Sequence, residues 1–336
     1  MMSYTKPQVQ SVHFPAFKAS LPSMEGKTVA ITGTTSGTGY IAAKVVAELG
    51  AKVLLLNRPS TRAEKSYEEL RSQFPAAELH AVDCDLQDFA SVRDAVQRIK
   101  GLCPEGIHVL ANNAGVMALE DVATKDGYDI QMQTNHLSHF LLTAELMPLL
   151  EKAANESGDS RVVHHSSVAR LSEKHLKAEY LEKNGGNLGG NSASMFFGGA
   201  RWVRYSQTKL ANAAFTAALH HKLQAKNSKV KALVAHPGLA NTNLQVTSVE
   251  EGGMGRLFTK MFMRFSQSQE DGAMGLIACM CLPEAKSGQF YGPGKGIMAM
   301  KGEAKAFALE PQYDNEDTRN MIWEKSNAAV GLQFDI

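Results

Sequence analysis

The stretch Thr32-Gly33-Thr34-Thr35-Ser36-Gly37-Thr38-Gly39 decides the fold that this sequence predicts. An apolar run at residues 28–32 leads into it and residues 40–49 follow at helical spacing, so the glycines lie between a strand and a helix. Glycines let the backbone approach a ligand closely, and a helix N-terminus offers unpaired N–H groups and a positive dipole. The stretch therefore predicts a pyrophosphate site for a dinucleotide, with a tight turn that binds nothing as the alternative.

Short apolar or β-branched runs alternate with longer segments at helical spacing along most of the chain. The candidate strands are residues 28–32, 52–57, 78–82, 108–111, 161–165 and 229–235. Near-continuous apolar runs such as Val53-Leu54-Leu55-Leu56 are what strands covered on both faces require. With right-handed crossovers, this series predicts the α/β class: a single doubly wound, Rossmann-type parallel sheet with helices on both faces.

The length of 336 residues permits either two domains or one large domain. No second series of strands follows the first, so we expect one domain over residues 26–336, preceded by an N-terminal arm at residues 1–25. Within that domain we expect an insertion at about residues 171–204, which contains six glycines, and a lid at about residues 250–265. Helical spacing at residues 314–330 predicts a C-terminal helical tail.

The composition excludes several classes of protein. Apolar residues make up 44% of the chain and charged residues 21%, as in an ordinary soluble globular protein. The net charge of +1 lacks the basic excess that binding to phosphate backbones needs, so we expect no nucleic-acid partner. Four cysteines are too few for a disulfide scaffold and have no metal-ligand spacing, which indicates a reducing compartment and no metal site. Without a long apolar run or a secretory signal, we expect a cytoplasmic protein with no integral membrane span.

The end of the second predicted strand distinguishes between the two nicotinamide cofactors. A site for NAD usually places Asp or Glu there, to hold the ribose 2′-hydroxyl. Here Leu56 is followed by Asn57 and Arg58, so no carboxylate repels a 2′-phosphate and the guanidinium can pair with it. We therefore expect NADP(H) to be preferred over NAD(H); the alternative is that Arg58 is a solvated loop arginine.

A tyrosine four residues before a lysine on a helix places both side chains on one face, where the ammonium can lower the pKa of the phenol. The sequence contains this spacing three times, at Tyr40/Lys44, Tyr205/Lys209 and Tyr291/Lys295. Gly292-Pro293-Gly294 interrupts the last pair, and the first pair lies on the helix of the glycine stretch. Tyr205 and Lys209 precede a strong helical segment and follow a predicted strand that ends in Ser166-Ser167, so they are the catalytic candidates.

At this point the sequence resembles the short-chain dehydrogenases/reductases, over about residues 27–292. The resemblance rests on ordered motifs: Thr32-Gly33-x-x-x-Gly37-x-Gly39, Asp85-Leu86, Asn112-Asn113-Ala114-Gly115, Asn135, Ser167, Tyr205-x-x-x-Lys209 and Pro237-Gly238. Within the family, the stretches around Asn135 and Tyr205 are similar to those of the retinol dehydrogenase and protochlorophyllide reductase branch.

The resemblance implies a role for each motif. Tyr205 would be the acid/base, Lys209 would bind the nicotinamide ribose and lower the tyrosine pKa, Ser167 would orient the carbonyl, and Asn135 would hold a water in the proton relay. The residues implied to bind the cofactor are Gly33, Thr35, Ser36, Gly37, Thr38, Gly39, Asn57, Arg58, Asp85, Leu86, Asn112, Ala114, Gly115, Tyr205, Lys209, Pro237, Gly238 and Thr242.

Three features depart from the family pattern or leave a choice open. Ser167 and Tyr205 are unusually far apart, so the insertion at 171–204 is expected to shape the substrate entrance. Ser166 competes with Ser167, because strand alternation points only one of two neighbours towards the crevice. The pair His164-His165 in the same strand is unusual for the family.

The segment 256–265 has an apolar face of Leu, Phe and Met side chains, opposite basic residues that recur every four positions. We interpret it as a lid over an apolar substrate, with core packing and a peripheral membrane contact as alternatives. The sequence thus predicts an NADP-dependent oxidoreductase that interconverts a carbonyl and an alcohol on an apolar small molecule. A carbon–carbon double-bond reductase and a non-catalytic dinucleotide-binding redox sensor are the alternatives, and a homo-oligomer is left open.

Overall fold

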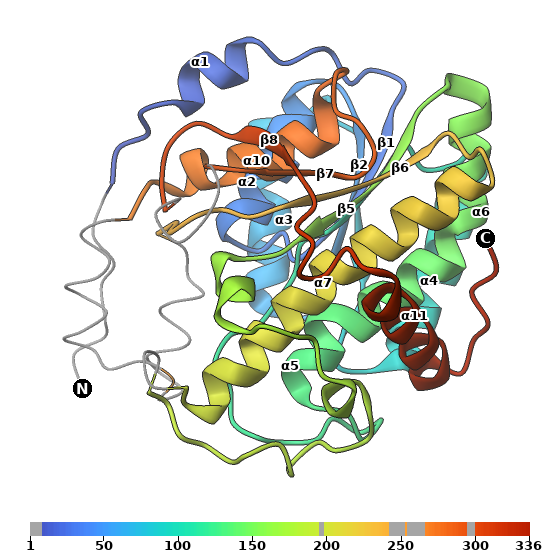
Figure 1. Ribbon diagram of the computed structural model, residues 1–336. Helices are drawn as coiled ribbons and strands as arrows, with labels where there is room; N and C mark the ends of the chain where they lie inside the picture. The colour runs from blue at the N-terminus through green and yellow to red at the C-terminus, as the bar shows by residue number, and fades with distance from the viewer. Residues whose placement is uncertain (1–8, 195–197, 242–252, 254–265, 294–299) are drawn as a thin grey trace.

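The computed structural model describes residues 9–194, 198–241, 253, 266–293 and 300–336, and its centre is one eight-stranded sheet (Figure 1). The strand order is β3-β2-β1-β4-β5-β6-β7-β8, and β8 pairs antiparallel to β7 while the other pairs are parallel. The strands are β1 (Thr28–Thr32), β2 (Lys52–Asn57), β3 (Leu79–Asp83), β4 (Val109–Asn112), β5 (Ser160–His165), β6 (Val230–Ala235), β7 (Gln289–Gly292) and β8 (Lys305–Ala308).

Helices cover both faces of the sheet (Figure 1). One face carries α2 (Gly37–Glu48) and α10 (Gln269–Cys281), which pack against each other, with α3 (Thr61–Gln73) beside them. The other face carries α4 (Phe89–Leu102), α6 (Ser138–Ser157) and α7 (Ala200–Ala225), and α11 (Glu316–Val330) packs on α7. The short elements are α1 (Phe14–Ala19), α5 (Ile130–Met132), the π-helical turn η1 (Gln133–Leu137) and the 3₁₀ turns η2 (Val168–Ser172) and η3 (Ala178–Leu181).

The predicted fold class is confirmed, since the sheet is doubly wound and mostly parallel. The six predicted strands are all present, with bounds within one residue of those expected. Sequence reasoning missed β7 and β8, because each has only four residues and the stretch between them is rich in glycine. At one edge the sheet departs from the parallel arrangement, because β8 runs antiparallel to β7.

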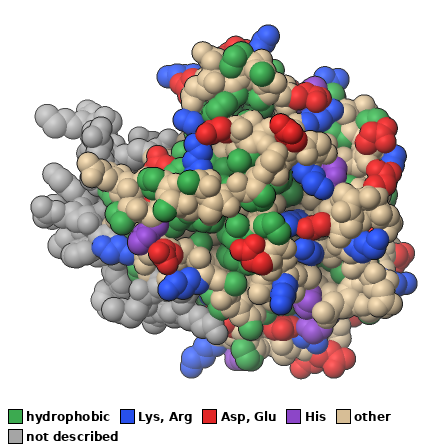
Figure 2. Space-filling model, turned by 90° about the horizontal axis from the view of Figure 1, so that it is seen from above, with side chains coloured by type: hydrophobic (Ala, Val, Ile, Leu, Met, Phe, Trp, Pro, Cys, Tyr) green, Lys and Arg blue, Asp and Glu red, His purple; other side chains and the backbone are tan. Residues whose placement is uncertain are grey.

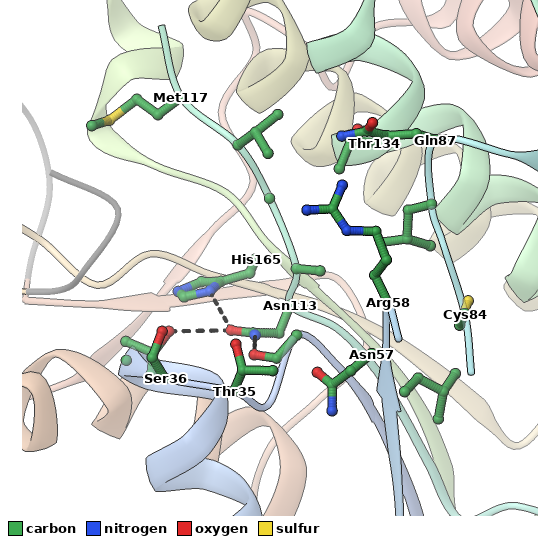
Figure 3. A pocket seen from close by; sticks show the side chains of 18 of the residues that line it. Thr35, Ser36, Asn57, Arg58, Cys84, Gln87, Asn113, Met117, Thr134 and His165 are labelled. Atoms are coloured by element: carbon green, nitrogen blue, oxygen red, sulfur yellow. Dashed lines mark hydrogen bonds between the residues drawn. The ribbon is translucent and has the colours of Figure 1, made fainter. Parts of the chain in front are cut away.

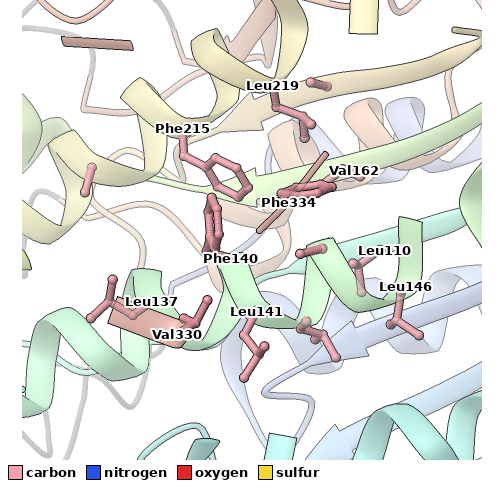
Figure 4. Close-up of a cluster of buried hydrophobic side chains, with 14 of the residues drawn as sticks. Leu110, Leu137, Phe140, Leu141, Leu146, Val162, Phe215, Leu219, Val330 and Phe334 are labelled. Carbon is pink, nitrogen blue, oxygen red and sulfur yellow. The ribbon is translucent and has the colours of Figure 1, made fainter. Parts of the chain in front are cut away.

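The alternation of side chains along the strands sorts the core into two clusters. In β2, Leu54 and Leu56 join the cluster under α4, α6 and α7, whereas Val53 and Leu55 join the cluster under α2 and α10. This double coverage explains why the strand is apolar at consecutive positions. In the first cluster aromatic rings from distant segments meet: Phe140 and Phe215 have centroids 4.9 Å apart (Figure 4).

Both described ends of the chain are attached to this core. Phe334, beyond α11, stacks on Trp323 with ring centroids 4.8 Å apart, and Trp323 in turn contacts Phe140. Near the other end, the backbone N–H groups of residues 12–14 donate to the carboxylate of Asp271, over 2.9, 3.0 and 2.8 Å. Asp271 lies in the first turn of α10, so one buried carboxylate holds the start of α1 against that helix. Charges of both signs are interspersed on the face shown in Figure 2.

Four buried histidines predict that acid destabilises the fold. Burial lowers the pKa of His136 and His165 to about 3 and that of His139 to about 4, and it lowers the pKa of His164 as well. In the unfolded chain each imidazole binds a proton below about pH 6.5, so the unfolded state holds more protons than the folded state from there down to about pH 4. The free energy of unfolding should fall by about 1.4 kcal/mol per pH unit for each histidine in that window.

Urea denaturation at about pH 7 and about pH 5.5 measures this loss. The variant His136→Gln keeps a polar partner for Ser326 and cannot titrate. Its free energy of unfolding should therefore change less steeply with pH, by the contribution of about one proton. Equal urea midpoints at the two pH values would contradict the prediction.

Candidate active site

A cavity of about 630 Å³ lies at the carboxyl ends of the central strands (Figure 3). The predicted site residues that line it are Gly33, Thr35, Ser36, Gly37, Thr38, Asn57, Arg58, Asp85, Leu86, Ala114, Gly115, Ser167, Tyr205, Lys209 and Pro237. Gly39, Asn112, Asn135 and Gly238 are not among the lining residues. Thr242 lies outside the described residues, as does the predicted lid at 250–265 apart from Gly253.

The glycine loop forms one wall of the cavity, and it depends on a close approach to β4. Gly33 has a φ of +74°, and a Cβ atom there would lie 2.8 Å from Ala114. A Cβ atom on Gly39 would come within 2.3 Å of the side-chain nitrogen of Asn113, so this glycine allows α2 to pack rather than lining the cavity. Asn57 braces the loop, since its Oδ1 accepts from the Thr34 N–H at 2.8 Å. The cradle at the N-terminus of α2 therefore fits the predicted pyrophosphate.

Basic residues border the end of the cavity that follows β2. Arg58 lines it, as predicted, and so does Arg62 in the first turn of α3. Sequence reasoning missed Arg62, although its position four residues after Arg58 was a usable signal. Asp85 also lines this end, and its carboxylate accepts from the Gln87 N–H at 3.0 Å.

Tyr205 and Lys209 lie on the opposite wall, on one face of α7. Both are buried, and the Lys209 Nζ donates to the His165 carbonyl at 3.0 Å and lies 5.7 Å from the centre of the Tyr205 ring. The two competing tyrosines are elsewhere: Tyr291 belongs to β7, and Tyr40 on α2 does not line the cavity.

Burial controls the acidity of this pair. It raises the pKa of Tyr205 to about 12, against a smaller lowering by a hydrogen bond with Ser167, and it lowers the pKa of Lys209 to about 8. Loss of solvent around the phenolate is the largest cause of this shift, and the expected lowering of the phenol pKa by Lys209 stays a prediction. At neutral pH Tyr205 is thus a protonated phenol, the form that donates a proton.

The two neighbouring serines at the end of β5 have different partners. The Ser166 hydroxyl donates to the Lys209 carbonyl at 2.6 Å and is buried. The Ser167 hydroxyl caps η2 by accepting from the Ala169 N–H at 3.2 Å, and Ser167 lines the cavity together with Tyr205. This arrangement supports Ser167 as the serine that acts beside the tyrosine.

Asn135 lies behind the cavity wall, on the π-helical turn η1. Its amide oxygen accepts from the Val116 N–H at 2.7 Å, and its amide nitrogen donates to the Val116 carbonyl and to the Thr208 hydroxyl, each at 2.9 Å. The side chain therefore joins the segment after β4 to α7. The expected role of Asn135 in holding a water stays a prediction.

The insertion expected at 171–204 is held to the site by buried charges, and its last residues already belong to α7. The Asp121 carboxylate accepts backbone N–H groups of Gly186, Leu188 and Gly190, at 3.0, 2.8 and 2.9 Å. Arg204, next to Tyr205, donates to the carbonyls of Leu188 and Gly190 and lies 3.3 Å from the Asp129 carboxylate.

Apolar side chains adjoin the tyrosine. Val116, Met117 and Leu119 line the cavity, and the Trp202 ring meets the Tyr205 ring edge-on at 5.9 Å. The Trp202 Nε1 donates to the Gly253 carbonyl at 3.0 Å. The wall beside the phenol is therefore suited to an apolar ligand.

The described part of the chain contains no helix with both the length and the hydropathy that crossing a membrane requires. It also contains no group of three or more His, Cys, Asp or Glu side chains placed to hold a metal ion.

The fold and the cavity together define the class of oxidoreductases that use a nicotinamide dinucleotide. Comparisons with known proteins identify the family: its sequence profile, described as short chain dehydrogenase, matches residues 27–181. Retinol dehydrogenase 14 of Mus musculus is 32% identical over 322 residues, 92% of this chain and 87% of that protein. The chain belongs to the short-chain dehydrogenase/reductase family, and the predicted resemblance is confirmed.

Two other similarities span nearly the whole chain. The polyprenol dehydrogenase of Homo sapiens is 28% identical over 316 residues, 93% of this chain and 87% of that protein. A crystal structure of an uncharacterized protein from Mycobacterium paratuberculosis has a TM-score of 0.72 and 28% identity, covering 98% of this chain and all of that one. The additions around the central fold therefore have counterparts in other proteins.

The buried charges under the insertion predict a large difference between two substitutions. Arg204→Leu leaves the buried carboxylates of Asp121 and Asp129 without their cation, so the free energy of unfolding should fall by about 3–5 kcal/mol. Lys325→Ala removes an exposed ion pair to Glu182, a residue of the insertion. This substitution should change the free energy of unfolding by less than about 1 kcal/mol. Urea denaturation of both variants measures the difference, and similar losses would contradict this account.

Proposed function

We propose that this protein is an NADP(H)-dependent oxidoreductase that interconverts a carbonyl and an alcohol on an apolar small molecule. The observation that carries the proposal is that Tyr205, Lys209 and Ser167 line one cavity together with the glycine loop. No other Tyr-x-x-x-Lys pair in the described residues borders this cavity.

Three side chains have separate roles at the reacting oxygen. The bound dinucleotide supplies or accepts a hydride. Ser167 orients the carbonyl oxygen, and Tyr205 donates a proton to that oxygen as negative charge develops on it. Lys209, held by the His165 carbonyl, places a positive charge beside the phenol and reaches the wall where the nicotinamide ribose would bind. A protonated Tyr205 can donate this proton in the direction of carbonyl reduction, the sense that we propose on the basis of NADP(H) as cofactor.

Two arginines and a missing carboxylate support NADP(H) as the cofactor. Arg58 and Arg62 border the cavity beyond β2, where the adenosine ribose of a dinucleotide lies in such folds. Asn57 occupies the position at which an NAD site carries Asp or Glu, and its side chain is engaged with Thr34.

An apolar substrate is supported by the wall and by the names of the relatives. Val116, Met117 and Leu119 present apolar surface to the cavity next to Tyr205. Two relatives that align over nearly the whole chain are named retinol dehydrogenase and polyprenol dehydrogenase, after long apolar alcohols. We therefore propose a moderately large apolar carbonyl or alcohol as the substrate of this chain.

Replacing the acid should abolish most of the activity. In an NADPH-oxidation screen over aldehydes, ketones and quinones, Tyr205→Phe should lower kcat by about 10²–10⁴-fold, because the phenol proton is lost while the ring is kept. Tyr40→Phe is the matched control, since Tyr40 shares the spacing to a lysine but lies outside the cavity. Activity that survives in Tyr205→Phe would overturn the mechanism, and an inactive wild type that binds NADPH would favour a non-catalytic module.

Cofactor preference should depend on Arg58. Arg58→Ala should weaken NADPH binding about 10-fold and leave NADH binding unchanged, because a charge-assisted hydrogen bond to the 2′-phosphate is lost. Arg71→Ala, at the far end of α3, removes the same charge away from the cavity and is the control. Fluorescence titration gives the dissociation constants of NADPH and NADH. A wild-type protein that binds NADPH no more tightly than NADH would contradict the assignment of NADP(H) as the preferred cofactor.

A further inference from the structure

His165, at the end of β5, forms part of the cavity wall, and its imidazole ring has no role in the function proposed above. Its ring lies beside Asn113, with Nδ1 2.9 Å from the Asn113 Oδ1 (Figure 3). Its neighbour His164 points to the other face of the sheet, where both ring nitrogens have partners, Thr216 and Asn112. His165 is thus the histidine of the unusual pair that faces the predicted cofactor.

The hydrogen bonds of Asn113 determine which nitrogen of His165 carries the proton. The Asn113 Nδ2 donates to the carbonyls of Thr32 and Gly33, at 2.9 and 3.2 Å, so the amide orientation is fixed and Oδ1 must face His165. The Thr38 hydroxyl donates to the same oxygen at 3.1 Å. An amide oxygen can only accept, so Nδ1 of His165 is the protonated nitrogen and Nε2 holds a lone pair in the neutral ring.

This Nε2 is a buried polar atom without a hydrogen-bond partner within the described part of the structure. Buried polar atoms are nearly always paired, so an unpaired one in a residue that lines a cavity indicates a missing partner. The charged or titratable groups that face the ring are Lys209 from α7 and His236 from the turn after β6, while Asn113 and Thr38 are neutral. Burial and these groups lower the pKa of His165 to about 3, which keeps Nε2 an acceptor at neutral pH.

We propose that Nε2 of His165 accepts a hydrogen bond from an N–H or O–H donor on the nicotinamide half of the bound dinucleotide. The inference rests on the proposed cofactor and adds a positioning residue to its site. The location supports it, because the His165 carbonyl binds the Lys209 Nζ and the chain continues directly into Ser166 and Ser167.

Because Nε2 of His165 can only accept a hydrogen bond, its partner must be a donor, and this points to the nicotinamide half of the dinucleotide. Pyrophosphate oxygens are acceptors, so a neutral Nε2 cannot pair with them. The nicotinamide half carries two kinds of donor, the carboxamide NH₂ and the ribose hydroxyls. An acceptor here also fixes the rotation of the ligand relative to Tyr205, which hydride transfer requires.

Two substitutions separate the two ring nitrogens. His165→Asn keeps a donor at the place of Nδ1, towards Asn113, and has no atom at the place of Nε2. His165→Gln puts an amide oxygen near the place of Nε2 and gives up the contact with Asn113. The ligands are NADPH, 2′-phospho-ADP-ribose, which lacks the nicotinamide ring, and adenosine 2′,5′-bisphosphate, which lacks the whole nicotinamide half; binding is measured by calorimetry.

We expect His165→Asn to bind NADPH about 3–10-fold more weakly than wild type and adenosine 2′,5′-bisphosphate equally well, with His165→Gln close to wild type for both. If 2′-phospho-ADP-ribose also loses affinity in His165→Asn, the donor is a ribose hydroxyl; if it does not, the donor is the carboxamide. Unchanged NADPH binding by His165→Asn, or equal losses for NADPH and adenosine 2′,5′-bisphosphate, would overturn the inference. A wild type that binds none of the three ligands would instead overturn the proposed function.

Wild-type protein with ¹⁵N-labelled histidine provides a test that needs no stable variant at His165. The Nε2 resonance should be that of an unprotonated nitrogen in the free protein, and NADPH should shift it while adenosine 2′,5′-bisphosphate does not. A protonated Nε2 in the NADPH complex would show that the ring donates to an anionic group and would contradict the inference.

Discussion

The close approach of the glycine loop to the end of β4 is the constraint on which the site depends. Thr32, the last residue of β1, accepts from the N–H groups of Asn113 and Ala114 through its hydroxyl, at 3.0 Å each, and this joins the two strands at the cavity. A Cβ atom on Gly33 or Gly39 would collide with these same residues. The glycines are therefore required first by the packing of α2 against β4, and the open helix N-terminus that can hold phosphate follows from that packing.

Burial gives the polar groups of the site their chemical character. The same loss of solvent that raises the pKa of Tyr205 lowers the pKa of Lys209 and of His165, because in each case the charged form is disfavoured. A protonated phenol, a lysine near its titration point and a neutral imidazole are the result. The polar network behind the wall, from Asn135 to Thr208, holds these side chains in place without touching the cavity.

The additions to the central fold are fastened to the same site. Arg204 precedes Tyr205 on α7, so the guanidinium that holds the insertion and the phenol that faces the cavity share one rigid helix. On the far side of α7, α11 packs through Trp323 against Phe140 and Phe215, which supports the helix from behind.

The sequence by itself determined the order of strands along the chain, the glycine loop and the placement of Tyr205 and Lys209 on one face of a helix, because all three depend on local spacing. Period-two and period-3.6 patterns are properties of neighbouring residues, so they can be read without a fold. The tertiary structure alone decided the hydrogen-bond partners of Ser166 and Asn135 and that β8 runs antiparallel. It also decided the direction of the Tyr205 pKa and the tautomer of His165, since solvent exclusion and hydrogen-bond partners arise from residues far apart in the chain.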